Sequence, residues 1–154
     1  MKRPRASTPE PLRDRALRYL ARREHSRAEL ENKLADGGDE LAAVLDALEA
    51  EGLLSDQRAA RAFANAKARR YGPRYIRHYL QQHGIAADLI DATLVESQRD
   101  TAGAVEEAWR RKFGRVPADA SERARQIRFL QARGFELDAI LGLIRRLERG
   151  TKSV

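Results

Sequence analysis

The chain has 154 residues, of which 42% are hydrophobic, 6% aromatic and 34% charged, and its formal net charge is +7. It contains no cysteine, which excludes a disulfide framework and a thiolate metal site. No apolar stretch approaches the roughly 18 uninterrupted residues of a membrane span, so we expect a cytoplasmic protein with no membrane partner. The positive charge favours contact with a polyanion, either nucleic acid or an acidic protein surface.

The chain begins with a segment rich in proline and basic residues. Residues 1–11 contain three prolines, and we expect them to form a disordered basic tail. Beyond the tail, apolar residues recur three and four positions apart, as in Leu41, Val44, Leu45 and Leu48, which is the helical spacing. No segment alternates convincingly between apolar and polar residues. The sequence therefore predicts an all-α fold.

An internal repeat organises the helices. A Leu-x-x-x-Gly pattern, with apolar residues six and ten positions after the glycine, occurs at Gly38, Gly84 and Gly134. We expect each glycine to end a helix in the left-handed conformation, and Ile85 and Phe135 to fold back onto the preceding turn. The sequence predicts three tandem three-helix repeats in an elongated, curved solenoid. The predicted repeats span residues 12–54, 55–98 and 99–150.

Each repeat also carries signals for where its helices begin. The first helices of the repeats are expected near residues 12–24, 57–70 and 101–113. Ser26 and Glu29 form a capping box at the start of the second helix of repeat one. In repeat two Pro73 follows Gly72 and occupies a first helical position. In repeat three we expect Ser121 to cap the equivalent helix.

Charge is segregated along the repeats. Residues 24–56 carry ten acidic side chains against only Arg27 and Lys33, whereas residues 57–83 carry no acid at all. A second basic cluster begins at Arg110. We expect these cations to bind nucleic acid or an acidic protein, and the alternative is that they pair with acids of the same chain. The candidate contact residues are Arg69, Arg70, Arg74, Arg77, Arg110, Arg111, Lys112, Arg115, Arg125, Arg128 and Arg133.

Tyrosines are interleaved with the basic residues of repeat two. Tyr75 and Tyr79 are four positions apart, beside Ile76 and Leu80. We expect the tyrosines to pack into the core, and the alternative is that Tyr71, Tyr75 and Tyr79 stack on bases.

The motifs of catalysis and cofactor binding do not occur. His25, His78 and His83 match no metal-ligand spacing, and Gly37 and Gly38 lack the lysine and hydroxyl of a phosphate-binding loop. There is no G-x-S-x-G motif and no thiol nucleophile. We expect a monomeric binding protein without metal or cofactor, and not an enzyme.

Several segments resemble the RecX family of recombinase modulators. They are residues 26–30 (SRAEL), 52–58 (GLLSDQR) and 129–135 (FLQARGF), of which the last is the most specific. Further matching positions are Leu34, Gly72, Ile76, Leu80, Gly84 and Ile85. The resemblance covers about residues 12 to 147. One departure is Ser55-Asp56, where the family often has two acids, and this pair should still cap the following helix.

The resemblance implies a regulator of the RecA recombinase in DNA repair and the SOS response. Family members have three tandem three-helix repeats, bind the RecA–single-stranded-DNA filament in its groove, and dampen ATP hydrolysis and strand exchange. The family offers no catalytic motif to transfer, and the candidate contacts rest on charge distribution alone. Two alternatives remain, a tandem helix-turn-helix module that binds DNA directly and a scaffold that binds only protein.

Overall fold

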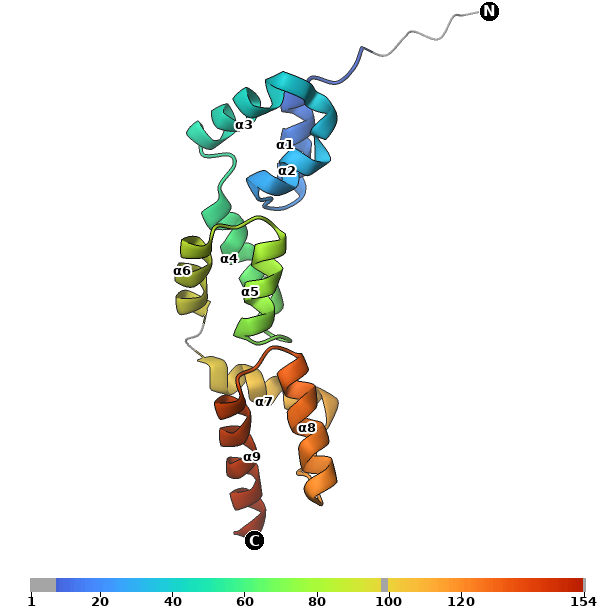
Figure 1. Ribbon diagram of the computed structural model, residues 1–154, viewed down its shortest axis with the longest axis vertical. Helices are drawn as coiled ribbons and strands as arrows, with labels where there is room; N and C mark the ends of the chain where they lie inside the picture. The colour runs from blue at the N-terminus through green and yellow to red at the C-terminus, as the bar shows by residue number, and fades with distance from the viewer. Residues whose placement is uncertain (1–7, 98–99, 154) are drawn as a thin grey trace, which may run out of the picture. The chain divides into compact units, whose positions relative to one another are not determined.

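The structure, a computed structural model, describes residues 8–97 and 100–153, and over these ranges it contains helices and no strand (Figure 1). The predicted all-α fold is therefore confirmed, with three α-helices in each repeat. The chain forms two compact units, residues 1–59 and residues 60–154. The α-helices are α1 (Leu12–Arg22), α2 (Arg27–Lys33), α3 (Leu41–Ala50), α4 (Asp56–Lys67), α5 (Pro73–Gln82), α6 (Ala87–Ser97), α7 (Thr101–Lys112), α8 (Ala120–Ala132) and α9 (Leu137–Lys152).

The predicted tail is only partly described. Residues 1–7 lie outside the described residues, and residues 8–11 are exposed without regular secondary structure.

Unit 1 contains α1 to α3, the start of α4, and a small leucine-rich core. Its buried side chains come from all three helices and the segment before α4, and each is at most 2% exposed: Ala16, Leu30, Leu34, Leu45, Leu48 and Leu54. Because leucines at three- and four-residue spacing share one face of a helix, this pattern buries one stripe per helix and leaves the charged faces in solvent.

The capping box predicted for α2 is present. The Glu29 amide donates to Ser26 Oγ at 3.1 Å, and the Ser26 amide donates to Glu29 Oε1 at 3.1 Å. Asp56 accepts from the Arg27 amide at 2.8 Å, so a residue of α4 satisfies a further free amide at the start of α2. Ser55 caps α4 by accepting from the Arg58 amide at 3.2 Å, as expected for the Ser55-Asp56 pair.

The end of α2 differs from the prediction. We expected Gly38 to end this helix, but α2 ends at Lys33 and a 3₁₀ helix, η1 (Ala35–Glu40), follows. Gly38 does take a left-handed φ of 62° within η1. The sequence Asp36-Gly37-Gly38-Asp39 explains the difference, because two glycines between two acids weaken the α-helix.

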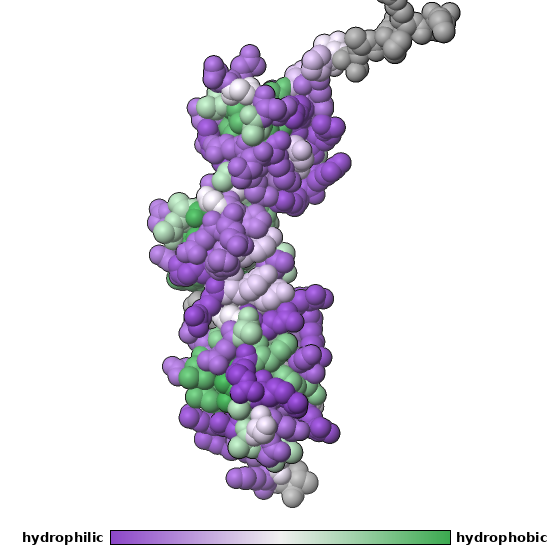
Figure 2. Space-filling view, turned by 45° about the vertical axis from the view of Figure 1, so that its right-hand side comes forward, coloured by the Kyte–Doolittle hydropathy of each residue, from purple (hydrophilic) through white to green (hydrophobic). Residues whose placement is uncertain are grey.

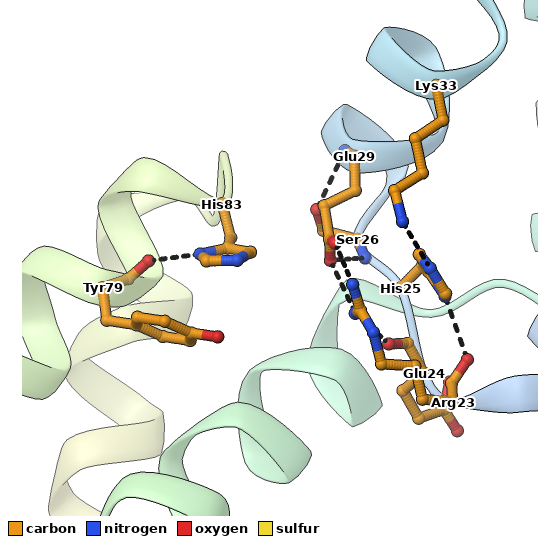
Figure 3. Close-up of polar contacts among 8 residues, drawn as sticks. All are labelled: Arg23, Glu24, His25, Ser26, Glu29, Lys33, Tyr79 and His83. Carbon is orange, nitrogen blue, oxygen red and sulfur yellow. Dashed lines mark hydrogen bonds and ion pairs between the residues drawn. The ribbon is translucent and has the colours of Figure 1, made fainter. Parts of the chain in front are cut away.

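A buried histidine lies in the turn between α1 and α2 (Figure 3). His25 is 2% exposed, its Nδ1 lies 3.0 Å from Arg23 O, and its Nε2 lies 3.3 Å from Lys33 Nζ. Lys33 can only donate, so Nε2 accepts and Nδ1 carries the proton, which is the neutral imidazole. Burial is the main cause that lowers the pKa of His25, and the charges of Arg23 and Lys33 lower it further.

In unit 2 the glycine pattern is confirmed in both repeats. Gly84 and Gly134 have φ of 72° and 89° and directly follow the caps of α5 and α8. The Phe135 amide donates to Leu130 O at 3.2 Å, and the Gly134 amide donates to Gln131 O at 2.9 Å, which is a Schellman motif. Ile85 and Phe135 are 5% and 1% exposed, so both pack back into the core as expected.

The start of α8 was predicted wrongly. We expected Ser121 to be the cap, but the helix begins at Ala120 and Asp119 accepts from the Glu122 amide at 2.8 Å. Glu122 in turn accepts from the Ala118 amide at 2.8 Å. These two bonds satisfy the amides of Glu122 and Ala118, which Ser121 inside the helix cannot do.

The core of repeat three joins α7, α8 and α9, and α8 and α9 run side by side (Figure 1). Trp109 of α7 is 4% exposed and donates from Nε1 to Gln126 Oε1 of α8 at 2.8 Å. Gln126 donates to Arg115 O at 3.0 Å. The buried amide thus satisfies the indole and fixes the turn between α7 and α8.

Two glycines join repeat two to repeat three. The Gly72 amide donates to Arg133 O at 2.7 Å, and the Arg74 amide donates to Gly134 O at 3.1 Å. A Cβ on Gly72 would lie 2.4 Å from Gly134 O, and a Cβ on Gly134 would lie 2.4 Å from the Tyr75 amide nitrogen. We call this contact the glycine joint. Two backbones meet here at a separation that admits no side chain.

We predict that Gly72→Ala destabilises the protein by about 1–3 kcal/mol, because the added methyl group overlaps backbone atoms that can only move together. The measurement is chemical denaturation followed by circular dichroism. Gly142→Ala in α9 is the control, since nothing lies within 4 Å of its Cβ position, and it should stabilise by about 0.5–1 kcal/mol. Equal effects of the two substitutions would contradict the tight contact at Gly72.

A second prediction concerns the pH dependence of unit 1. The pKa of His25 is lower in the folded protein than its ordinary value of about 6.5. The contribution of His25 to stability is therefore fully present above about pH 6.5 and is lost as the pH falls toward the folded pKa. The thermal midpoint of the protein should therefore fall between pH 7 and pH 5. His25→Gln, which cannot titrate, should show a smaller fall.

The carboxylate of Glu29 affects stability in a lower pH range than His25 does. Burial alone would raise the pKa of Glu29, but the hydrogen bonds from Arg23 and from the Ser26 amide lower it, so its contribution is lost only below about pH 4.5. Identical midpoint curves for the protein and His25→Gln between pH 7 and pH 5 would contradict the role given to His25.

Candidate nucleic-acid interface

The predicted contact cations lie almost entirely at the surface. Ten of the eleven are exposed, and Arg133 is half-buried. The face drawn in Figure 2 is predominantly hydrophilic, with hydrophobic areas most extensive low in the view, over the C-terminal helices. All eleven belong to unit 2, so their arrangement can be described within one compact body.

Four of these cations pair with acids of the same chain. Arg77 binds Asp91 at 2.8 Å, and Arg125 lies 4.0 Å from Glu122. The other two pairs are Arg110 with Glu106 at 2.7 Å and Arg111 with Glu107 at 2.8 Å. Internal pairing, the alternative explanation, thus applies to these four. Within the described ranges the other seven make no ion pair: Arg69, Arg70, Arg74, Lys112, Arg115, Arg128 and Arg133.

Four cations from three helical segments converge on one hollow. Arg70 follows α4, Arg111 and Lys112 end α7, and Arg133 caps α8. Together with Ala108 and Phe129 they line a space of about 210 Å³. An adjoining hollow of about 340 Å³ shares Arg70 and Arg111 with the first. Its other lining residues are Ala66, Lys67, Arg69 and Tyr71. We call the two hollows together the cation groove.

The cation groove contains one cation that the sequence did not single out. Lys67 ends α4 and its Nζ lies 4.9 Å from the ring centroid of Tyr79 and 5.7 Å from that of Tyr71. The absence of acids over residues 57–83 is the signal that could have identified it.

Other predicted residues lie elsewhere. Arg115 and Arg125 line a separate hollow with Lys112 and Glu122, between α7 and α8. The remaining predicted residues line none of these three hollows: Arg74, Arg77, Arg110 and Arg128.

The tyrosines of repeat two form a stack along one side of α5. The ring centroids of Tyr71 and Tyr75 are 3.7 Å apart with planes at 12°, and those of Tyr75 and Tyr79 are 6.4 Å apart. Ile76 and Leu80 point into the core at 3% and 0% exposure, whereas the three tyrosines are half-buried. Tyr75 and Tyr79 lie one position before Ile76 and Leu80, on the adjoining face of α5, and Tyr71 precedes the helix. The expected core packing is therefore only partial.

The stack continues into repeat three through Arg133. Its guanidinium carbon lies 5.1 Å from the ring centroid of Tyr71 and 5.0 Å from that of Phe129. Lys112 Nζ lies 5.5 Å from the centroid of Phe129. These are cation–π distances, so aromatic rings hold Arg133, Lys112 and Lys67 at the groove. Burial, followed by the neighbouring Tyr71, raises the pKa of Tyr75 above its ordinary value.

In the part of the chain that the structure describes, no three His, Cys, Asp or Glu side chains gather closely enough to hold a metal ion. His83 Nδ1 lies 2.7 Å from Tyr79 O in the last turn of α5, a contact within the helix end (Figure 3). No helix in the described part is long and apolar enough to cross a membrane.

Comparison with known proteins identifies all three repeats. The RecX family models match in order: the first three-helix domain at residues 13–49, the second at 55–94 and the third at 103–144.

Similar proteins include regulatory protein RecX of Chromobacterium violaceum, which is 45% identical over 88% of this chain and 90% of that protein. The RecX protein of Ectopseudomonas mendocina is 47% identical over 89% of this chain and 95% of its own. A crystal structure of RecX from Lactobacillus salivarius superposes with a TM-score of 0.71, at 21% identity, over 89% of this chain and 94% of that one. The structural likeness supports the fold, and the sequence matches support the family. The resemblance drawn from the sequence is confirmed, and the chain belongs to the RecX family of regulatory proteins.

Proposed function

We propose that this protein is a cytoplasmic regulator of the RecA recombinase in DNA repair and the SOS response, and that it acts by binding rather than by catalysis. It would bind the RecA–single-stranded-DNA filament as a monomer and lower the rates of ATP hydrolysis and strand exchange. The RecX relatives support this proposal, because they share more than 40% of their residues with the chain over most of its length.

The observation that carries the proposal is the convergence of unpaired cations in unit 2. Arg70, Lys112 and Arg133 come from separate helical segments and meet at one hollow without a carboxylate among its lining residues. Unpaired, solvent-facing cations raise the local positive potential, which attracts a polyanion and speeds its association. A filament of protein on DNA presents such a polyanion along its whole length.

The proposed mechanism is competitive. Binding of the basic surface of unit 2 along the filament would cover DNA phosphate or an acidic recombinase surface that strand exchange requires. Such a block needs affinity and shape but no reacting group, which agrees with the regulatory designation of the relatives.

We predict that Arg70→Glu combined with Lys112→Glu strongly weakens inhibition of the DNA-dependent ATP hydrolysis of RecA, because both side chains line the cation groove. Both side chains are exposed and unpaired within the described residues, so reversal should leave the helical circular dichroism unchanged. Two reversed contacts should raise the half-inhibitory concentration by about tenfold or more.

The matched control is Arg145→Glu combined with Arg146→Glu. These exposed arginines lie on α9, in the same unit but not among the residues that line the cation groove. The control variant should inhibit almost as well as the unaltered protein. Unchanged inhibition by the Arg70 and Lys112 variant, or equal loss in both variants, would overturn the assignment of the binding surface.

A further inference from the structure

We infer that the cation groove binds the sugar–phosphate backbone of single-stranded DNA and does not stack its bases. This inference rests on the proposed function, because it names which part of the nucleoprotein filament the groove contacts. It concerns Arg70, Arg111, Lys112 and Arg133 around Phe129, together with Lys67 and Arg69 in the adjoining hollow.

The hollow lined by Phe129 has an excess of positive charge. Its lining includes four cations and no carboxylate, and Arg111 alone among the four has an ion-pair partner in the described part of the chain, Glu107 at 2.8 Å. Like charges gathered at a hollow repel one another, so an anion bound there is favoured.

Aromatic rings orient the cations of the groove. Arg133 lies over Tyr71 and Phe129 at 5.1 and 5.0 Å, and its carbonyl accepts from the Gly72 amide at 2.7 Å. Over the described residues, the side chains of Arg70, Lys112 and Arg133 donate no hydrogen bond to protein. A guanidinium that is held over aromatic rings keeps the donors on its edge for a ligand, and this fork fits two oxygens of one phosphate.

The aromatic rings of the groove already contact other side chains of the protein. Tyr71 stacks on Tyr75 at 3.7 Å and carries both Arg133 and Lys67 over its ring. Phe129 carries Arg133 and Lys112 over its ring and meets Phe113 edge to face at 5.3 Å. These contacts occupy the ring surfaces that a base would need. The rings therefore support cations, and the groove recognises charge and not base identity.

The two hollows of the cation groove are continuous with each other. Because the two hollows share Arg70 and Arg111, the cations form a track from Lys112 to Lys67 and not an isolated pocket. A nucleic-acid backbone presents negative charges at regular intervals along a line, so it suits a track better than a single carboxylate does.

The test measures DNA binding by the full chain without recombinase. Fluorescence anisotropy would compare labelled oligothymidylate with an oligomer of the same length built from abasic sugar–phosphate units. We expect the two dissociation constants to agree within about threefold, because the same phosphate contacts are available in both. An abasic chain that binds more than about tenfold more weakly would show that bases are stacked and would overturn the inference.

The variants locate the binding on the groove. Arg70→Ala combined with Lys112→Ala should weaken binding to both oligomers about tenfold and reduce the slope of log affinity against log salt by about 1.4, the value for two phosphate contacts on a single strand. Arg133→Lys keeps the charge but removes the planar fork, and it should weaken binding severalfold. The control is Arg145→Ala combined with Arg146→Ala, which removes two exposed arginines of α9. Equal losses in groove and control variants would overturn the inference.

A competition assay distinguishes nucleic acid from an acidic protein. Polyglutamate of matched charge should displace the labelled oligomer much less effectively than unlabelled oligothymidylate, and equal displacement would contradict a phosphate site. The result is also separable from the proposed function. Groove-dependent DNA binding without inhibition of RecA would refute the proposed function alone. Inhibition of RecA by the unaltered protein, together with DNA binding that the groove substitutions leave unchanged, would refute this inference alone.

Discussion

The glycine joint is the contact on which the rest of unit 2 depends. Gly134 ends α8 in a left-handed conformation and at the same time accepts the Arg74 amide at 3.1 Å. Gly72, which caps α5, donates to Arg133 O at 2.7 Å. Since the residues that precede these glycines are Tyr71 and Arg133, the joint also brings ring and guanidinium to 5.1 Å. The backbone contact thus sets the position of Arg133 in the cation groove, and side-chain packing between the repeats brings the other cations to it.

The two units treat charge differently. In unit 1 arginines form close ion pairs with acidic side chains, as in Arg13 with Glu51 at 2.6 Å and Arg27 with Asp46 at 2.6 Å. Three carboxylates surround Arg27 and raise the pKa of its guanidinium. Surface pairs of this kind add little to stability, but they neutralise the potential that a polyanion would otherwise meet. The charge segregation along the sequence therefore becomes a difference in how much positive charge each unit leaves unpaired.

The sequence was a good guide to the helices and a weaker one to their ends and to the groove. Apolar spacing and the pair of Gly84 and Gly134 predict the repeats, because periodicity and left-handed glycines are local properties. The cap of α8 was predictable, because Asp119 and Glu122 have the spacing of a helix start, but the expectation named Ser121 instead. The meeting of Arg70 with Lys112 depends on packing between repeats, as does the pairing of Arg77 with Asp91. The distribution of charge along the sequence identifies the cations, but it does not show which of them form ion pairs within the chain.

The aromatic rings of the groove orient its cations without neutralising them. A carboxylate would orient an arginine through a bidentate pair, but it would also cancel the charge that a ligand needs. An aromatic ring orients the same guanidinium through its face and leaves the net charge intact. Tyr71 and Phe129 supply this support for Arg133, and Tyr75 holds Tyr71 in place at 3.7 Å. The tyrosines interleaved with arginines in repeat two therefore support the cations and leave a surface on which Arg133 is ordered but keeps its net charge.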